Sequence, residues 1–439
     1  MSHTARYGFA TRALHAGKDP RERSHTPPIY MTASWEIRTP GELVQGFRGE
    51  LPLYHRLGGN PTVTYVEKKI CSLEGGAAAR LRADGMNAVC MSIYAALKRI
   101  GRGAQLIAVG PTYGKTYELF RSLGEEGYSV VQLPAKDPNL FRLVAQAMNE
   151  KTAAVIGEIT TNPTIMLWDV PAVKQSMRER FCAIKGRVPV SVAQERILQE
   201  FQMPVLIVDA SFTTPYNFRA FEQGGDVVVH SATKGLAAHG AFTLGIVVVS
   251  RKTMKEAPDY WPHAQGWANE KGGTPGAMEA WLLGQWMEDL HLRAPVQNRN
   301  AEAVAQFLEG HPAVVSVSYP GLASHPQHEL AKRIMRTPYN EPAYGSMVAF
   351  RIKGGLAAAQ RFLFGGTKYT IIKHKPSLGY TKSIDESSAL LSQQNMHPAD
   401  KALFDITDDL IRFSAGTEDT PDLLDAFEHA LFISQTVPA

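Results

Sequence analysis

A lysine that directly follows a short apolar run is the first candidate for covalent chemistry. Residues 227–229 are all valine, and the segment His-Ser-Ala-Thr-Lys follows them and ends at Lys234. Ligands of parallel sheets bind where the strands end, so this lysine is placed to meet one. Burial lowers the pKa of an amine, and a free amine forms a Schiff base with an aldehyde. The hydroxyls of Ser231 and Thr233 are candidate anion ligands, and a solvated surface lysine is the alternative interpretation.

An aspartate ends a second apolar run in the same way. The run 205–208 precedes Asp209, and a buried carboxylate requires a cationic partner. A protonated pyridine nitrogen is such a partner, because the carboxylate holds its proton and keeps the ring an electron sink. An aspartate that caps the following helix is the alternative.

A glycine opens a predicted helix elsewhere in the chain. Apolar residues recur at helical spacing over 86–100, and Gly85 stands directly before Met86. The N–H groups and the dipole of a helix start favour anions such as phosphate, and an ordinary N-cap by Asp84 is the alternative. Lysine, carboxylate and phosphate site together predict a site for pyridoxal phosphate, because each meets the need of a different end of that cofactor.

Short apolar runs alternate with helical stretches from residue 62 to about residue 250. Runs that are apolar on both faces are typical of buried parallel strands joined by crossover helices. We therefore expect an α/β large domain with a mostly parallel, doubly wound sheet. The predicted strands are 105–109, 153–156, 205–208, 227–229 and 246–249.

Three regions are expected along the chain: an N-terminal arm over 1–61, a cofactor-binding large domain over 62–265 and a smaller α+β domain over 266–439. The Gly-rich stretch 266–276 suggests the second boundary. The segment 173–202 is long for one crossover and is interpreted as a surface helical insertion. The predicted elements of the small domain are an amphipathic helical stretch over 277–309 and strands at 314–317, 347–352 and 410–414.

Composition excludes several functional classes. Of 439 residues 44% are apolar, and 46 lysines and arginines against 42 acidic residues give a net charge of +4. No lysine or arginine run suggests a nucleic-acid partner, and no apolar stretch reaches the roughly 18 residues of a membrane span. The three cysteines lack metal spacing and no signal-peptide pattern is present, so we expect a cytoplasmic protein. We expect His325 and His328 to bind no metal.

Motifs along nearly the whole chain resemble one known family. The segment 230–234 matches its pattern in full, whereas 54–62 has one residue more than the pattern. Further matching segments are 11–17, 27–30, 113–117, 158–163, 319–322, 377–379 and 411–414. The chain resembles the Cys/Met-metabolism family of pyridoxal-phosphate enzymes, which are of fold type I. This group contains cystathionine γ-synthase, cystathionine lyases, methionine γ-lyase and O-acetylhomoserine sulfhydrylase.

The resemblance implies a role for each cofactor residue. Lys234 would hold the cofactor as a Schiff base and then move protons as general base and acid. Asp209 would pair with the pyridine nitrogen, and Tyr113 would stack on the ring and assist the leaving group as an acid. The implied phosphate ligands are Gly85, Met86, Ser231 and Thr233.

The resemblance also implies a substrate site and a partner subunit. Arg412 would bind the substrate carboxylate through two hydrogen bonds, helped by Ser377 and Asn162. Tyr54 and Arg56 would reach the phosphate in the neighbouring subunit. The minimal active unit would be a homodimer, usually doubled into a homotetramer.

Several positions depart from the family pattern on the substrate side. Lys115 stands where relatives usually have Gly or Cys. If it faces the pocket it would favour an anionic or polar substrate tail, and a solvated lysine is the alternative. The Met-Thr-His segment of relatives is absent, and Ser-Gln-Gln at 392–394 lies roughly there. Other departures are Pro376, 380–382, 235–241 and Gln285-Trp286.

We expect elimination at Cγ of a γ-substituted amino acid of methionine, homocysteine, cystathionine or acylhomoserine type, giving a 2-oxo acid and ammonia. The bond broken would be C–S or another Cγ–heteroatom bond. Replacement on an activated homoserine, by a sulfhydrylase or synthase reaction, is the alternative. Alternatives of other classes are a non-catalytic pyridoxal-phosphate-binding protein and a fold-type-I enzyme of other chemistry, such as an aminotransferase.

Overall fold

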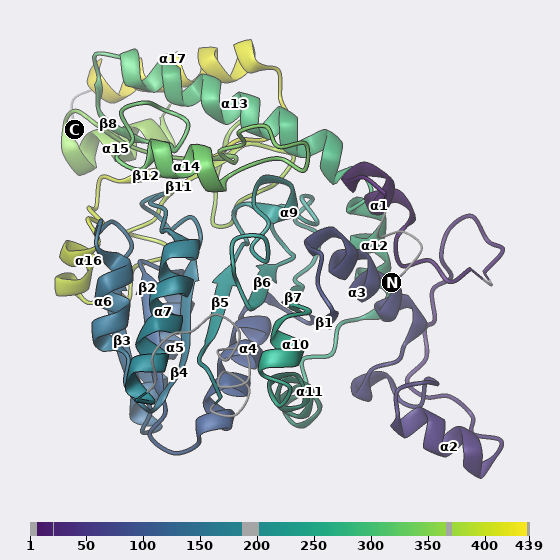
Figure 1. Ribbon diagram of the computed structural model, residues 1–439. Coiled ribbons are helices and arrows are strands. Elements are labelled where there is room, and N and C mark those ends of the chain that lie inside the picture. Colours follow the sequence, from purple (N-terminus) through teal and green to yellow (C-terminus); the bar gives the residue numbers. More distant parts are fainter. Residues whose placement is uncertain (1–6, 21, 187–201, 366–370, 437–439) are drawn as a thin grey trace.

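The computed structural model describes residues 7–20, 22–186, 202–365 and 371–436, which form two sheets with helices packed on them (Figure 1). The strands of the larger sheet are β1 (Ala78–Arg82), β2 (Gln105–Gly110), β3 (Ser129–Pro134), β4 (Thr152–Glu158), β5 (Val205–Asp209), β6 (Val227–Ser231) and β7 (Gly245–Val249). Their order is β1-β7-β6-β5-β4-β2-β3. The pairs from β3 to β6 are parallel, whereas β7 runs antiparallel to both β6 and β1.

Helices cover both faces of this sheet because its strands are apolar on both sides. Successive side chains of a strand point to opposite faces, so Leu206 and Val208 belong to one buried cluster and Val205 and Ile207 to the other. Burying one such side chain contributes about 1.5–3 kcal/mol. The first face packs on α3 (Pro61–Glu74), α6 (Leu140–Ala147), α7 (Val170–Ile184) and α12 (Ala277–Trp286). The second packs on α4 (Gly85–Ile100), α5 (Gly114–Glu125) and α11 (Tyr260–Lys271).

The smaller sheet lies beyond the carboxyl ends of the parallel strands, at the top of Figure 1. Its strands are β8 (Val314–Ser318), β9 (Met347–Ile352), β10 (Lys373–His374), β11 (Ile384–Ser387) and β12 (Ile411–Ser414), in the order β10-β11-β12-β9-β8. Buried phenylalanines such as Phe350, Phe413 and Phe427 join it to its helices. The helices of this part are α13 (Leu290–Gly310), α14 (His328–Ile334), α15 (Gly355–Phe364), α16 (Pro398–Leu403) and α17 (Thr420–Thr436).

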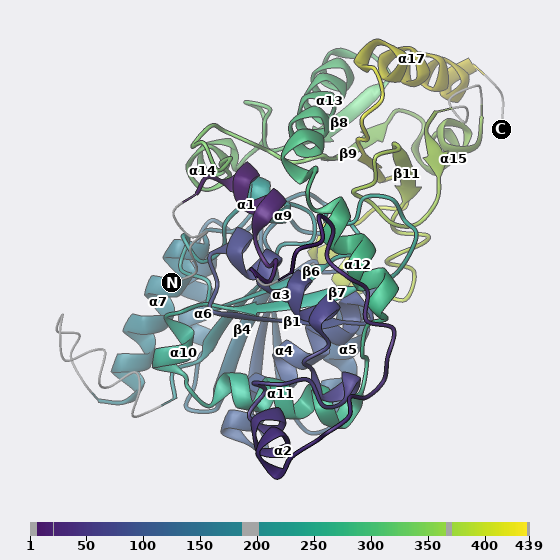
Figure 2. The same ribbon diagram turned by 90° about the vertical axis from the view of Figure 1, so that its right-hand side faces the viewer.

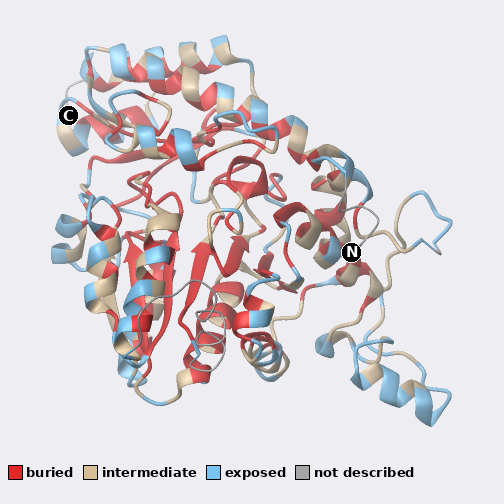
Figure 3. Cartoon of the chain, viewed as in Figure 1, coloured by how far each residue is buried: buried red, intermediate tan, exposed pale blue. Residues whose placement is uncertain are grey.

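Beyond its first helix, the N-terminal arm extends away from both sheets in Figure 1, and in Figure 2 it passes in front of the larger sheet. Its first helix, α1 (Phe9–His15), buries Phe9 and Ala13, but α2 (Pro40–Phe47) has no buried residue. Met31 and Phe47 are 72% and 75% exposed, and Figure 3 shows the arm as mostly exposed chain beside buried strands. Apolar side chains exposed to this extent typically mark an interaction surface.

Every strand predicted for the two domains is confirmed, as β2, β4, β5, β6 and β7 in the larger sheet and as β8, β9 and β12 in the smaller. The strands β1, β3, β10 and β11 escaped prediction. β1 has the sequence Ala-Ala-Arg-Leu-Arg, and β3 buries none of its residues fully, so neither shows a continuous apolar run. Within the described residues no helix is long and apolar enough to cross a bilayer.

Two expectations are corrected. The first part of 173–202 is not a surface insertion, because it lies in α7, which connects β4 to β5 and buries Met177 and Phe181. Its second part, 187–201, lies outside the described residues. The stretch after Gly266 does not begin as a loop, because α11 continues to Lys271 and packs on α4. The boundary predicted at 265/266 falls inside this helix.

Candidate cofactor and active site

Neighbouring strands of the larger sheet end in polar residues that meet at one edge. Glu158 ends β4, Asp209 ends β5 and Ser231 ends β6. Glu158 and Asp209 are direct partners in the parallel register. The loop after β6 carries Lys234, so the predicted lysine and aspartate do lie at the same sheet edge.

Lys234 is half-buried and faces the smaller domain. Its Nζ donates a hydrogen bond to Ser377 Oγ at 2.6 Å. Burial, followed by the positive charge of Arg412, lowers the pKa of Lys234 to about 8, while Glu386 opposes the shift. A substantial part of this amine is therefore neutral near physiological pH and able to attack an aldehyde.

Asp209 keeps one side of its carboxylate available. Its Oδ1 accepts hydrogen bonds from the backbone N–H and the hydroxyl of Ser211, at 2.9 and 2.6 Å. Within the described chain Oδ2 makes no hydrogen bond. Burial raises the pKa of Asp209, and the Ser211 hydrogen bonds oppose that shift. A cation bound at Oδ2 would stabilise the charged carboxylate.

The start of α4 packs closely against the end of β6. A Cβ added to Gly85 would lie 2.8 Å from Cβ and Oγ of Ser231, so glycine is required there. Asp84 Oδ1 caps the helix through the backbone N–H of Asn87 at 2.7 Å, which leaves the first N–H groups of the helix for another acceptor. Met86 accepts a contact from Thr116 Oγ1 at 3.6 Å, and Thr233 Oγ1 is bonded to the backbone of Leu244.

Tyr113 precedes α5, and its ring is partly exposed. Its backbone N–H donates to Glu158 Oε1 at 2.6 Å. Burial raises the pKa of the Tyr113 phenol. Burial and the charge of Asp209 also raise the pKa of Glu158 well above its usual range. From the sequence, Glu158 was noted only as part of the matching segment 158–163. It follows an apolar run, and the same signal identified Asp209.

Arg412 on β12 brings the smaller domain into the site. Its Nη1 donates to Asn162 Oδ1 at 2.6 Å and its Nη2 to the backbone oxygen of Ser377 at 3.0 Å. Nη2 also forms a buried ion pair with Glu386 at 2.9 Å. Ser377 has φ +110°, a conformation that only glycine adopts easily. Sequence reasoning missed Glu386, which faces Arg412 in the register of β11 and β12.

Three predicted residues bond to groups other than Lys234 and its partners. Both carboxylate oxygens of Glu118 accept hydrogen bonds from Lys115 Nζ, at 2.8 and 2.9 Å, and the lysine side chain is 55% exposed. Arg56 Nη1 donates to the backbone oxygen of Asn269 at 2.7 Å, and Tyr54 is exposed on the arm. The single chain therefore does not bring Lys115, Tyr54 or Arg56 to Lys234.

The two histidines questioned in the sequence bond to the backbone. His325 Nε2 lies 3.2 Å from Ile165 O, and burial lowers its pKa to about 4. His328 Nδ1 lies 2.8 Å from Pro320 O. Both rings therefore have structural partners.

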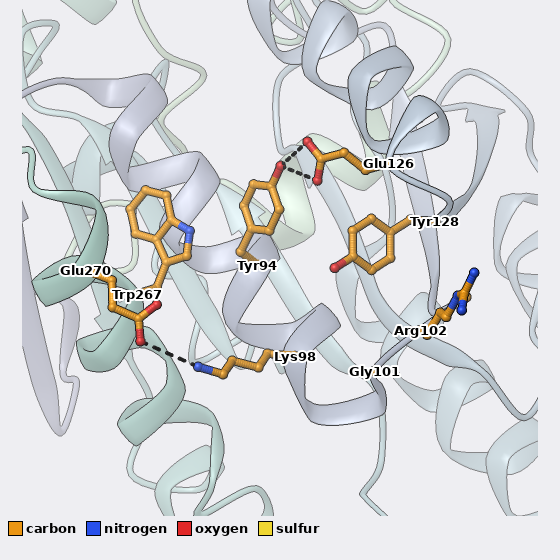
Figure 4. A pocket seen from close by; sticks show the side chains of 9 residues that line it. Tyr94, Lys98, Gly101, Arg102, Glu126, Tyr128, Trp267 and Glu270 are labelled. Carbon is orange, nitrogen blue, oxygen red and sulfur yellow. Dashed lines mark hydrogen bonds and ion pairs between the residues drawn. The ribbon is translucent and has the colours of Figure 1, made fainter.

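A separate cavity of about 490 Å³ lies at the other end of α4 (Figure 4). Tyr94, Trp267 and Tyr128 line it, and Lys98 faces Glu270 across it at 3.8 Å. The helix α4 has 16 residues, which span about 24 Å at 1.5 Å per residue. This cavity is thus remote from Lys234 and from the helix start at Gly85.

Known proteins resemble this chain over nearly its full length. L-methionine γ-lyase of Pseudomonas putida is 32% identical over 429 residues, which are 97% of this chain and 97% of that protein. Cystathionine γ-lyase of Homo sapiens is 32% identical over 426 residues, which cover 96% of this chain and 93% of that protein.

Solved structures agree with these relatives. Cystathionine γ-lyase from Lactobacillus plantarum, complexed with L-serine, has a TM-score of 0.82 at 26% identity, covering 98% of this chain and all of that one. Cystathionine γ-synthase from Xanthomonas oryzae pv. oryzae, in complex with aminoacrylate and cysteine, has the same TM-score and identity and covers 98% and 99%. These neighbours confirm the predicted α/β fold of type I, with a mostly parallel large sheet and a smaller C-terminal one.

The family profile described as Cys/Met metabolism PLP-dependent enzyme matches residues 10–185 and 192–432. Together with relatives above 30% identity across the chain, it confirms the resemblance drawn from the motifs. This protein belongs to the Cys/Met-metabolism family of pyridoxal-phosphate-dependent enzymes.

Proposed function

We propose that this enzyme eliminates the γ-substituent of an amino acid of methionine, homocysteine, cystathionine or acylhomoserine type, giving a 2-oxo acid and ammonia. The observation that carries the proposal is the continuous set Lys234–Ser377–Arg412, which joins an amine of lowered pKa to a buried guanidinium. Such a pair can handle a proton and hold a carboxylate at the same place. The lyase names of relatives in two organisms support elimination.

The residues fit pyridoxal phosphate at both of its ends. The cradle at Gly85, which a Cβ would fill, suits the phosphate. The unbonded Oδ2 of Asp209 suits the pyridine nitrogen, and Lys234 suits the aldehyde. When bound, the cofactor supplies an aldehyde that condenses with amines and a ring that withdraws electrons from bonds at the substrate Cα. We propose Gly85, Met86, Ser231 and Thr233 as phosphate ligands and Tyr113 as the residue stacked on the ring.

Residues of the chain would then move protons, bind the substrate carboxylate and assist the leaving group. Lys234, held at Nζ by Ser377, would accept the proton of the substrate Cα and, as general base and acid, move protons between Cα and Cβ of the substrate and C4′ of the cofactor. Arg412 binds the substrate carboxylate, and Asn162 keeps the guanidinium in place. Asp209 keeps a proton on the pyridine nitrogen. Tyr113 assists departure of the γ-substituent as an acid, and its raised pKa keeps it protonated for this task.

We propose Lys115 as a ligand for the tail of the substrate. To bind the tail, the Lys115 side chain would have to break its ion pair with Glu118. Nζ already meets both oxygens of that carboxylate. An anionic tail would have to compete with this ion pair, whereas a neutral tail would leave it intact.

Replacement by a thiol is the second candidate function, and the likeness to cystathionine γ-synthase of Xanthomonas oryzae supports it. The test is to incubate the enzyme with γ-substituted amino acids and to measure 2-oxo acid with and without added thiol. We expect 2-oxo acid without thiol. Product that forms only with thiol would establish replacement, and no product with any of them would favour the non-catalytic alternative.

We propose that two copies form the minimal active unit and that a tetramer forms from two such pairs. The exposed apolar residues of the arm, including Phe47 and Met31, support a second copy as the occupant of that surface. Tyr54 and Arg56 would then reach the partner's phosphate. The three free cysteines support a reducing, cytoplasmic location.

A further inference from the structure

A segment of the smaller domain, residues 388–406, crosses back onto the larger domain beside the site. We name it the bracing segment; its helix α16 lies at the left edge of the molecule in Figure 1. Tyr117 Oη donates to Asp400 Oδ2 at 2.5 Å, and Asn395 Nδ2 donates to Glu118 Oε1 at 2.8 Å. The segment is therefore tied to α5, the helix that follows Tyr113.

Gln393 is the fully buried residue of this segment that reaches the site. Its Nε2 donates to the backbone oxygen of Thr112 at 2.8 Å and to that of Asn162 at 3.0 Å. An amide nitrogen has two hydrogens, so both are used. The next residue of the chain after Thr112 is Tyr113, and Asn162 is the residue that holds Arg412. One side chain thus spans the two loops that carry the ring-stacking and carboxylate-binding groups.

Packing around Gln393 leaves little freedom. A Cβ added to Gly114 would come within 1.9 Å of the backbone oxygen of Ser392, so the bracing segment touches the start of α5 directly. The Ser392 hydroxyl also donates to Glu386 Oε1 at 2.7 Å. Glu386 is the ion-pair partner of Arg412. The segment therefore holds the carboxylate-binding arginine from two sides.

We propose that Gln393 is a positioning residue that sets the spacing between Tyr113 and the Asn162–Arg412 pair, and so tunes recognition of the substrate α-carboxylate. This inference rests on the proposed function. Gln393 belongs to the Ser-Gln-Gln segment that departs from the family pattern, and its neutral amide donates both of its hydrogens to backbone carbonyls. Glutamate could not replace it, since an ionised carboxylate has no hydrogen to donate to the two carbonyls.

The test compares Gln393→Leu with Gln394→Leu in the holoenzyme. Leucine is close to glutamine in volume but donates no hydrogen bond, and Gln394 is the exposed neighbour. Binding of glycine is followed by the change in absorbance of the bound cofactor, with glycinamide as the ligand that lacks the carboxylate. We expect Gln393→Leu to weaken glycine binding about tenfold or more, because each lost hydrogen bond contributes up to about a factor of ten. Glycinamide binding should stay within about twofold.

A second measurement reports on the surroundings of the cofactor ring rather than on substrate binding. The visible circular dichroism of the cofactor depends on how Tyr113 lies against it, so it should change in Gln393→Leu and stay unchanged in Gln394→Leu. Tyr117→Phe removes a contact of the bracing segment but neither carbonyl bond, and should leave glycine binding near the wild-type value. If Gln393→Leu does not fold, Gln393→Asn, with a shorter amide, should show a weaker effect in the same direction.

Equal glycine affinity in Gln393→Leu and wild type would overturn the proposal, as would an equal loss in Tyr117→Phe. These readouts do not require turnover. A wild-type protein that binds no cofactor would instead overturn the proposed function.

Discussion

Single charges around Lys234 determine when this residue is reactive. The Nζ atom is partly buried, lies near Arg412 and bonds to Ser377. Both burial and the neighbouring guanidinium penalise the ammonium form, and the opposing charge of Glu386 only partly compensates them. The guanidinium that we propose to bind the substrate carboxylate therefore also lowers the pKa of the Lys234 amine.

The rate at which pyridoxal phosphate attaches to the apoprotein should rise with pH and level off above about 8, since the pKa of Lys234 is lowered to about 8 from 10.5. Between these values the unfolded chain binds more protons than the folded one, so the free energy of unfolding gains from Lys234 as the pH rises. Absorbance stopped-flow across a pH series measures the attachment. Arg412→Leu should move the midpoint upward, and an unchanged midpoint would contradict the role of Arg412.

Glu158→Gln should keep cofactor binding and at least about a third of kcat. The raised pKa favours the protonated form of Glu158, which a neutral amide resembles, and an amide oxygen can still accept the N–H of Tyr113. Glu158→Leu, which lacks an acceptor, is the matched loss variant and should fall about tenfold. A large loss in Glu158→Gln would mean that the residue works as an anion, and steady-state kinetics decides.

At the scale of elements, the site depends on three strands that end, and one helix that begins, at the same edge of the larger sheet. β4, β5 and β6 deliver Glu158, Asp209 and Ser231, and α4 begins where β6 ends. The packing of Gly85 on Ser231 is possible only without a side chain. It brings the helix start, with its free N–H groups, against the strand end.

Gly85→Ala should weaken cofactor affinity about tenfold or more, because the new methyl group would separate α4 from Ser231 and displace the phosphate ligands. Equilibrium dialysis of pyridoxal phosphate measures the change. Gly124→Ala in α5, where the added Cβ meets nothing within 4 Å, is the matched control and should bind as the wild type does. Equal affinities for all three proteins would remove Gly85 from the phosphate site.

At the scale of the whole molecule, the chain presents an arm with apolar side chains and no cover for them. In the described part of the chain, Arg56 bonds to Asn269 rather than to any residue near Lys234. A site completed by a neighbour explains both facts, since closed symmetric pairs exchange identical surfaces.

Mixtures of two inactive variants test this arrangement. Lys234→Ala lacks the reactive amine, and Arg56→Ala lacks the proposed arm ligand. Refolding them together should restore about a quarter of wild-type activity, because random pairing places one intact site in half of the dimers. Each variant refolded alone is the control, and no recovery in the mixture would show that the arm serves its own subunit.

Much of the scaffold was predictable because buried strands show up in the sequence as short apolar runs. The valines before His230 and the run before Asp209 favoured strands, since short β-branched runs that are apolar on both faces are typical of a buried parallel sheet. The strand β1 has two arginines among its five residues and therefore shows no such apolar run. The antiparallel direction of β7 could not be predicted either, because β7 is buried on both faces as the neighbouring parallel strands are.

The sequence by itself determined the family and the cofactor, and it supplied the lysine, the aspartate and the helix start that we propose as its ligands, because these depend on residue types at short spacings. Only the tertiary structure decided that Ser377 holds Lys234, that Glu386 neutralises Arg412 and that Gln393 joins Thr112 to Asn162. These contacts join residues far apart in the chain. No local pattern encodes such a distance, since it is set by how two sheets pack against each other.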